Sequence, residues 1–203
     1  MFAQEKQGSR QAHRGGQVPA SATMNELMGS VHAFASLVGE AIEKGPLREV
    51  AGTRVTFPQL TLLTVLARNP KWKIGDVAHV LGVSNAAASK AVDRLVRHRM
   101  LQRREAASDR RAAELSLTRQ SRRLLSAFAA ARNRHLKHSL RRFPAEELRE
   151  IASGLDRLST ALLGDSANGT HLCLRCGVFP RQRCQLRKLV GENCFYHRSV
   201  SHN

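Results

Sequence analysis

The sequence predicts a mainly α-helical protein that contains one short β-hairpin and ends in a small cysteine-rich appendage. Over most of the first 163 residues, apolar residues recur three and four positions apart, which is the spacing of helices with one buried face. Residues 101–118 change to an alternating pattern, which indicates two short strands. All four cysteines follow residue 172, so the C-terminal segment differs in composition from the rest of the chain.

The composition favours a folded protein with a polyanionic partner. The net charge is +17, from 33 Lys and Arg against 16 Asp and Glu, while a hydrophobic content of 42% is ordinary for a globular chain. A basic folded surface suits nucleic acid, an anionic membrane or an acidic protein. No apolar run approaches the roughly 18 residues that span a bilayer, and the N-terminus lacks the apolar region of a secretory signal. We therefore expect a cytoplasmic protein without a membrane partner, in which clustered cysteines bind metal or respond to redox state.

Composition shifts divide the chain into four segments. Residues 1–20 are polar and glycine-rich, and they predict a flexible basic arm. Residues 21–163 contain the periodic elements and predict one domain. The sequence GDSANGT over residues 164–170 is typical of a linker, and residues 171–203 form the cysteine-rich tail.

The first two helices are defined by their boundary residues. Apolar spacing predicts a helix over residues 22–44, with Gly45-Pro46 as its stop signal. Thr56 is a good N-cap for a second helix that ends before Pro70.

The next elements form a recognisable supersecondary unit. A short helix over residues 74–81 is followed by a turn at Gly82 and by a helix that Ser84 caps and that runs to about His98. The two strands then span residues 101–105 and 111–118. Leu115 and Leu117 point to one face of this hairpin. Two helices, a glycine turn and a hairpin make a winged helix-turn-helix.

Two long helices complete the predicted domain. The first covers residues 119–143 and ends at Pro144, and its apolar stripe consists of Leu125, Phe128, Leu136, Leu140 and Phe143. The stripe of the second consists of Leu148, Ile151, Leu155, Leu158 and Leu162. Both stripes fit a core, but helices this long also fit a bundle between two subunits.

In a winged helix-turn-helix the second helix enters the major groove, so its outward face is the candidate DNA-reading surface. Helical geometry turns Val92, Leu95 and Val96 inward. On the opposite side, Asn85 suits a two-point contact to adenine, Ser89 suits either donor or acceptor edges, and Ala86 suits a thymine methyl group. The small side chains of Ala86, Ala87 and Ala88 would allow a close approach, although alanines also simply favour helix formation. The phosphate candidates on this helix are Lys90, Arg94 and Arg97.

The segments "VDRLVRHRMLQRR" and "DRRAAELSLT" resemble the multiple-antibiotic-resistance regulator (MarR) family, and the resemblance covers about residues 22–163. It rests on an Asp-x-Arg followed by a strand that ends Leu-x-Leu-Thr. In this chain those residues are Asp109, Arg111, Leu115, Leu117 and Thr118.

The resemblance implies a function and several residue roles. It implies a homodimeric, sequence-specific transcriptional regulator, most simply a repressor, that binds a double-stranded DNA operator, with the long helices as the dimer interface. Arg111 would enter the minor groove, Asp109 would brace it, and Arg110 would contact a phosphate. A narrow minor groove attracts an inserted guanidinium, which agrees with this role. The full set of predicted DNA-binding residues is Ser84, Asn85, Ala86, Ser89, Lys90, Arg94, Arg97, Arg103, Asp109, Arg110 and Arg111.

Three positions depart from the family pattern. The glycine that often precedes the first wing strand is Arg99, which would be costly if the position requires a positive φ. The usual Asp-Pro of the wing tip is Ala106-Ala107, and a glycine after the Leu-x-Leu-Thr is Ser121. None of these changes removes a proposed DNA contact.

Nothing in the sequence indicates an enzyme. His135 and His138 lie three residues apart, and without a nearby carboxylate they are expected to be surface residues. Residues 119–142 carry eight Lys or Arg and no acid, which fits either a solvated helix face or phosphate contacts from its first turns.

The tail has the composition of a metal site. Cys173-x-x-Cys176 and Cys194-x-x-His197 form two close pairs, and Cys184 lies between them, so five candidates are available for a four-ligand site. Zinc is the first interpretation, and an iron–sulfur cluster on the four cysteines is the alternative. A metal-free thiol switch and a purely structural appendage remain open.

A zinc site, an iron–sulfur cluster or a thiol switch in the tail would each make the protein a sensor. Its effector would then be a metal, a small molecule or a change in redox state. The second function class is a metal- or iron–sulfur-centred redox protein that binds nucleic acid without sequence preference. Competition between one operator and bulk DNA separates the two classes.

Overall fold

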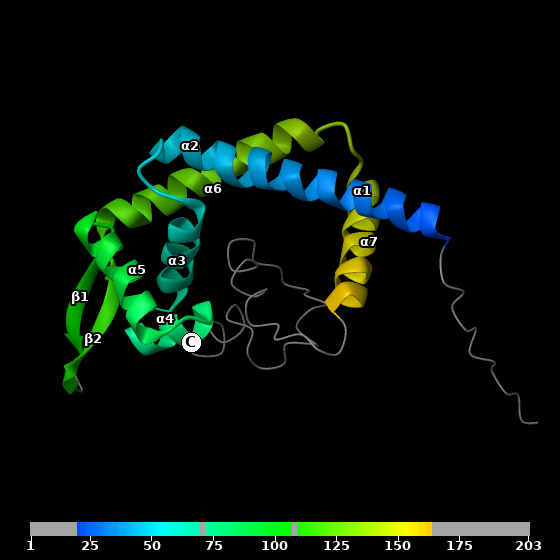
Figure 1. Ribbon diagram of the computed structural model, residues 1–203. Coiled ribbons are helices and arrows are strands. Elements are labelled where there is room, and N and C mark those ends of the chain that lie inside the picture. Colours follow the sequence, from blue (N-terminus) through cyan, green and yellow to red (C-terminus); the bar gives the residue numbers. More distant parts are fainter. Residues whose placement is uncertain (1–19, 70–71, 107–108, 164–203) are drawn as a thin grey trace, which may run out of the picture. The chain divides into compact units, whose positions relative to one another are not determined.

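The computed structural model describes residues 20–69, 72–106 and 109–163, and for residues 104–113 the description covers the backbone only (Figure 1). The chain divides into two compact units, the first ending at Val38 and the second beginning at Gly39. The four cysteines lie outside the described residues.

The first unit contributes helix α1 (Ser21–Leu37), none of whose residues is buried. The predicted helix is therefore present, but its apolar side chains do not form a core within the described part of the chain. Its exposed large hydrophobic residues are Met24, Leu27, Met28, Phe34 and Leu37. The helix continues into the π-helical segment η1 (Val38–Lys44).

The prediction that Gly45-Pro46 stops the helix is wrong, because these residues begin helix α2 (Gly45–Ala51). Proline is accepted in a first helical turn, where its missing N–H has no partner to lose and its fixed φ suits a helix. A Cβ atom on Gly45 would lie 3.0 Å from the carbonyl oxygen of Glu40, which is an unusually close contact, so a glycine suits this position.

Helix α3 (Phe57–Arg68) begins as predicted. The backbone N–H of Thr56 donates to Gln59 Oε1 (2.9 Å), and the N–H of Gln59 donates to Thr56 Oγ1 (3.4 Å). This reciprocal capping box satisfies two N–H groups that a helix start otherwise leaves unpaired.

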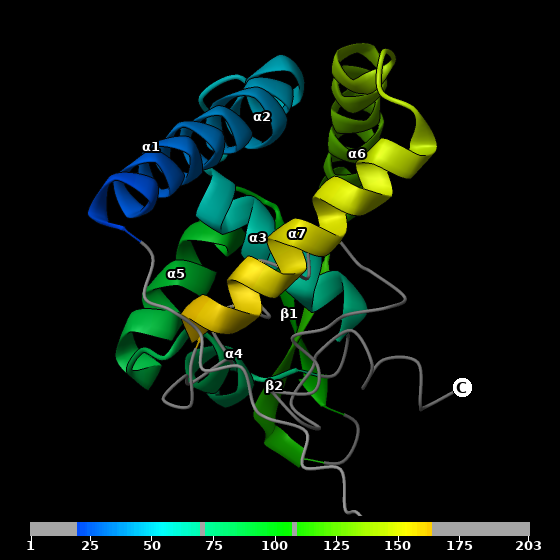
Figure 2. The same ribbon diagram turned by 90° about the vertical axis from the view of Figure 1, so that its right-hand side faces the viewer.

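Helices α4 (Ile74–Leu81) and α5 (Asn85–Arg97) precede an antiparallel hairpin of β1 (Leu101–Ala106) and β2 (Asp109–Leu117). In both views the hairpin lies beside α4 and α5 (Figures 1 and 2). The strands reach further toward the wing tip than the sequence predicted, with an irregularity between Glu105 and Ala106.

One hydrophobic core joins α2 to the hairpin. Leu115 and Leu117 are buried, so their predicted common face is confirmed. The N–H of Leu115 also donates to the carbonyl of Trp72 (3.1 Å), which ties β2 to the segment before α4. The largest fully buried apolar side chains are Leu60, Leu63, Leu66, Val77, Val92, Leu95, Leu101 and Leu115.

The buried residues of helix α6 (Arg119–Leu140) lie between Ser121 and Ala131, and none of its residues beyond Ala131 is buried. Thr118 caps it by accepting from the N–H of Ser121 (3.3 Å) and donating to the carbonyl of Arg99 (2.8 Å). Ser121 is fully buried, and its hydroxyl donates to the carbonyl of Met100, which gives this departure from the family pattern a structural role. Of the predicted stripe, Phe128 is buried whereas Leu140 is exposed.

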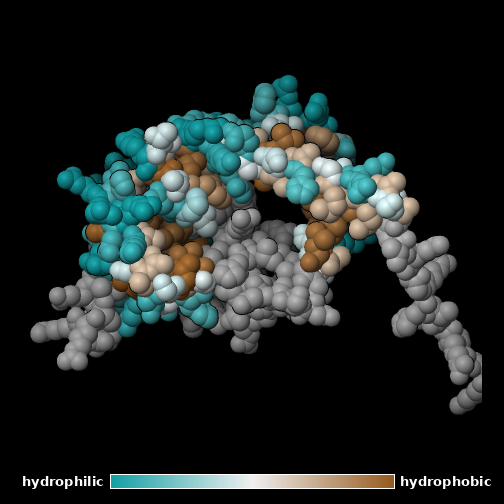
Figure 3. Space-filling view, viewed as in Figure 1, coloured by the Kyte–Doolittle hydropathy of each residue, from teal (hydrophilic) through white to brown (hydrophobic). Residues whose placement is uncertain are grey.

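Helix α7 (Ala145–Leu163) has apolar residues at its surface, as Figure 3 shows. Leu155 is 37% exposed and Leu162 is 66% exposed, although the regular spacing would suit a core. The sequence left open whether this stripe packs within the chain, and among the described residues of α7 none is buried.

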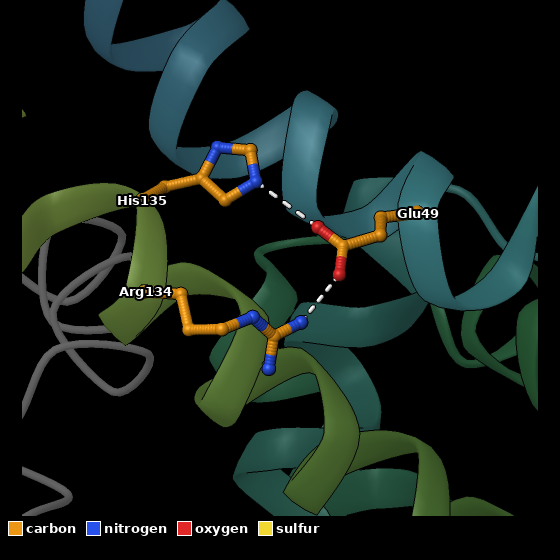
Figure 4. A network of polar contacts seen from close by, with 3 residues as sticks. All are labelled: Glu49, Arg134 and His135. Atoms are coloured by element: carbon orange, nitrogen blue, oxygen red, sulfur yellow. Dashed lines mark hydrogen bonds and ion pairs between the residues drawn. The ribbon is translucent and has the colours of Figure 1, made fainter. Parts of the chain in front are cut away.

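A polar network links α2 to α6 (Figure 4). Glu49 accepts from Arg134, and its other carboxylate oxygen lies 3.0 Å from His135 Nε2. His135 and His138 are exposed, as expected for surface residues. His135 nevertheless has a carboxylate partner, which comes from a helix far away in the sequence. Hydrogen bonding from His135 and then from Arg134 lowers the pKa of Glu49.

Candidate nucleic-acid interface

The turn between α4 and α5 sets the entry of the candidate reading helix. Gly82 adopts a left-handed conformation with φ 63°. The N–H of Val83 donates to the carbonyl of Ala78 (3.1 Å) and that of Gly82 to His79 (3.3 Å), which together make a Schellman motif. Ser84 then caps α5 by accepting from the N–H of Ala87 (3.2 Å), as predicted. Its hydroxyl proton can still be donated to a phosphate.

The two faces of α5 separate largely as predicted. Val92 and Leu95 are buried, and Val96 is partly buried against the same core. Ala88 is also fully buried, so the prediction that it helps the helix approach DNA is wrong. A position four residues before Val92 lies on the same helix face, which makes Ala88 part of the inner stripe. The exposed residues are Asn85, Ala86, Ala87, Lys90, Arg94 and Arg97.

The cations of this outer face remain available to an anion. No ion pair in the described part of the chain involves Lys90, Arg94 or Arg97. Long basic side chains on an exposed face suit phosphate contacts, which position a protein on DNA without reading its sequence.

Two other predicted contact residues are engaged within the protein. Arg103 Nη2, from β1, donates to Asp93 Oδ1 at 2.6 Å, and Ser89 Oγ lies 3.4 Å from Asp93 Oδ2. Asp93 thus connects the outer face of α5 to the first strand of the wing. Asp93 was not among the predicted site residues, and the one sequence signal for this contact is its position four residues after Ser89.

The end of α5 repeats the geometry of the end of α4. Arg99 has φ 57°, and it is the one non-glycine residue with a positive φ in the described part of the chain. The N–H of Met100 donates to the carbonyl of Leu95 (2.8 Å) and that of Arg99 to Val96 (2.8 Å). The position therefore requires the conformation that glycine adopts most easily, as the sequence comparison with the family anticipated.

The remaining predicted site residues lie where the structure describes the backbone alone or outside the described residues. Asp109, Arg110 and Arg111 lie in β2, where the description covers the backbone alone. The predicted metal ligands Cys173, Cys176, Cys184, Cys194 and His197 lie outside the described residues. Within the described part of the chain, no group of three or more potential metal ligands occurs, and no helix is long and apolar enough to cross a membrane.

Comparison with known proteins identifies this arrangement. Residues 55–112, from the turn before α3 to the middle of β2, match the model of the MarR family. This match assigns the winged-helix segment of the chain to the MarR family. Similarity to a family of DNA-binding transcriptional regulators indicates that role rather than an enzyme.

Relatives of the regulator extend the match beyond the winged helix. The uncharacterized HTH-type transcriptional regulator YfiV of Bacillus subtilis (strain 168) is 27% identical over 118 residues, which make up 58% of this chain and 74% of that protein. The crystal structure of YusO from Bacillus subtilis has a TM-score of 0.57 at 23% identity and covers 71% of this chain and 99% of its own.

A third comparison has the same fold. Streptococcus pneumoniae FabT, solved in complex with DNA, has a TM-score of 0.55 at 20% identity and covers 70% of this chain and 97% of its own. These likenesses show that the chain shares its fold with these proteins beyond the winged helix-turn-helix.

Proposed function

We propose that the protein is a sequence-specific repressor that binds a pseudo-palindromic operator as a homodimer. The observation that carries the proposal is the outer face of α5, where Asn85, Lys90, Arg94 and Arg97 are all exposed. The opposite face of the same helix is sealed into the core through Val92. The helix is thus held rigidly while its amide and cationic groups face outward, as base reading and phosphate contact require.

The predicted wing contacts remain part of the proposal. Arg111 would enter the minor groove, with Asp109 as its brace and Arg110 at a phosphate. The antiparallel hairpin supports a projecting wing, and in the described part of the chain its base is anchored through Leu101 and Leu115.

The exposed apolar faces of α1 and α7 support a dimer. Leu37 is 65% exposed in α1, and Ile151, Leu155 and Leu162 are exposed in α7. A second copy of the chain is the occupant that such helices suit, because regular stripes on long helices pack into inter-subunit bundles. A dimer would also present two α5 helices to two half-sites.

Selection of random double-stranded DNA on the full-length protein at fixed salt tests operator recognition. We expect one inverted repeat to be enriched, and that repeat should outcompete bulk DNA. Equal binding of selected and unselected DNA would contradict sequence-specific recognition and would favour the alternative of non-specific nucleic-acid binding.

The phosphate contacts have a separate readout. Arg94→Gln should reduce the steepness of log K against log salt by about 2 in a dimer, one contact in each half-site. Arg149→Gln is the matched control, because it removes the same charge from α7, where Arg149 pairs with Glu146. An unchanged slope for Arg94→Gln would remove α5 from the phosphate contacts.

We further propose that the cysteine-rich tail senses metal or redox state. Two close pairs, Cys173-x-x-Cys176 and Cys194-x-x-His197, with Cys184 between them, support a tetrahedral zinc site, and the four cysteines support an iron–sulfur cluster as the alternative. Six Lys and Arg between residues 175 and 198 favour the thiolate form.

Elemental analysis and a visible spectrum of anaerobically purified protein test this sensor. Zinc without a visible band supports the first assignment, whereas iron, sulfide and a brown colour support the second. The double variant Cys173→Ser/Cys176→Ser should lose the metal. Absence of stoichiometric metal would overturn both assignments.

A further inference from the structure

The hydroxyl of Ser89 has a different kind of partner from the hydroxyls of four other helical residues, Thr61, Thr64, Ser159 and Thr160. Thr61 and Thr64 in α3 donate to the backbone carbonyls four residues earlier, at 3.0 and 2.9 Å. Ser159 and Thr160 in α7 do the same at 2.7 and 2.8 Å. Ser89 instead lies 3.4 Å from Asp93 Oδ2, one turn further along the helix.

The direction of this contact follows from the chemistry of the two groups. A serine hydroxyl has one proton and two lone pairs, whereas a carboxylate can only accept. The proton of Ser89 must therefore point at Asp93, which leaves the lone pairs of the hydroxyl for any further partner. A serine without this neighbour could rotate its proton toward an acceptor or a donor as required.

Asp93 is itself held in place from the wing. Arg103 Nη2 donates to Asp93 Oδ1 at 2.6 Å, while the other carboxylate oxygen, Oδ2, faces Ser89. The side chain of Asp93 is 46% exposed and that of Arg103 is 41% exposed, so this ion pair lies at the surface that DNA would cover. Displacement of water by DNA strengthens such interactions, because the local dielectric constant falls.

We propose that Asp93 sets the base preference of Ser89. By holding the hydroxyl proton, Asp93 makes Ser89 an acceptor, and an acceptor in the major groove pairs with the amino group of adenine or cytosine. Guanine N7 and O6 and thymine O4 are acceptors themselves, so they offer Ser89 no donor. Asp93 is then a positioning residue that acts through Ser89. This inference rests on operator reading by α5.

The test is the base preference of the full-length protein at each position of its selected operator, measured as dissociation constants for the four bases at fixed salt. We expect wild-type protein to prefer adenine or cytosine at one position of each half-site. Ser89→Ala should reduce the ratio of affinities between the preferred bases and the other bases at this position by about 2- to 10-fold, which is the range of one neutral hydrogen bond. The base preferences at the other operator positions should stay unchanged.

Asp93→Asn is the decisive variant. An amide can donate as well as accept, so the hydroxyl of Ser89 is released, and guanine or thymine should be tolerated at the same position. Arg103→Ala is the matched control, because it breaks the link to the wing but keeps Asp93 beside Ser89. It should weaken overall binding and retain the adenine or cytosine preference. Thermal unfolding establishes that each variant is folded.

The outcomes separate this inference from the proposed function. If wild-type protein selects an operator but Ser89→Ala changes no position, the inference is wrong and operator recognition stands. If Arg103→Ala relaxes the preference as much as Asp93→Asn does, Asp93 acts through the wing and the inference is again wrong. If wild-type protein selects no sequence at all, both proposals fail.

Discussion

The ends of α4 and α5 have the same backbone geometry but different residues at the critical position. Gly82 and Arg99 both adopt left-handed conformations, with φ of 63° and 57°, and both are followed by the hydrogen bonds of a Schellman motif. At the first end the following residue, Val83, is 43% exposed, whereas at the second end Met100 is 7% exposed. The first end sets the entry of α5, and the second sets the start of the wing.

The difference between the two helix ends shows what allows a non-glycine residue to keep a left-handed conformation. A left-handed conformation costs a non-glycine residue about 1–2 kcal/mol. At Arg99 the buried side chain of Met100, with Leu95 packed in the same core, holds the chain in this turn, and Thr118 adds a hydrogen bond to the Arg99 carbonyl at 2.8 Å. At Gly82 the apolar residue that follows is exposed, so the turn depends more on glycine itself.

The largest expected effect is at the buried anchor of the second end. Met100→Ala should reduce the free energy of unfolding by about 2–5 kcal/mol, because it removes a buried side chain and leaves a cavity beside Leu95. Chemical denaturation at fixed protein concentration measures the loss. A loss below about 0.5 kcal/mol, the range of ordinary surface changes, would show that Met100 does not hold this turn.

Gly82→Ala should have the next largest effect. A Cβ atom at this left-handed position should reduce the free energy of unfolding by about 1–2 kcal/mol. Because Ser84 and the start of α5 follow directly, operator affinity should fall as well. Gly75→Ala is the matched control, since Gly75 lies within α4 and a Cβ atom there meets nothing within 4 Å. Equal effects of the two changes would contradict a special role for Gly82.

Arg99→Gly should act in the opposite direction. It relieves the strain of the left-handed residue, but glycine loses more backbone entropy on folding, so the net gain should be about 0.5–1 kcal/mol. For a chain of this size we expect the melting temperature to rise by about 1–4 °C. A melting temperature that falls would mean that the Arg99 side chain contributes more to folding than its conformation costs.

These two ends also show what can be predicted from sequence. Thr56 and Ser84 were identified as caps because capping is a local interaction between residues three apart. The left-handed turn at Arg99 was anticipated only as a departure from the family pattern, since arginine itself gives no sign of a positive φ. The prediction for Gly45-Pro46 failed because the same residues stop one helix or start another, depending on the preceding turn.

Contacts between elements that are distant in the sequence could not be predicted from the sequence. Glu49 and His135 are 86 residues apart, and neither residue type indicates the other as its partner. The link from Arg103 to Asp93 depends on where β1 returns beside α5, which is set by packing of the whole unit. Likewise, the stripes of α5 and α7 have similar spacing, but only the stripe of α5 is buried within the described chain.

The smallest expected effect is at the exposed residue of the first end. Val83→Ala removes apolar area that solvent already reaches, so the free energy of unfolding should change by no more than about 0.5 kcal/mol. The turn should survive, because its hydrogen bond from the N–H of residue 83 to the Ala78 carbonyl involves the backbone alone. Denaturation of Val83→Ala beside Met100→Ala therefore compares the two anchors directly. A loss for Val83→Ala as large as that for Met100→Ala would mean that both ends are held by apolar anchors, and that Gly82 and Arg99 differ for another reason.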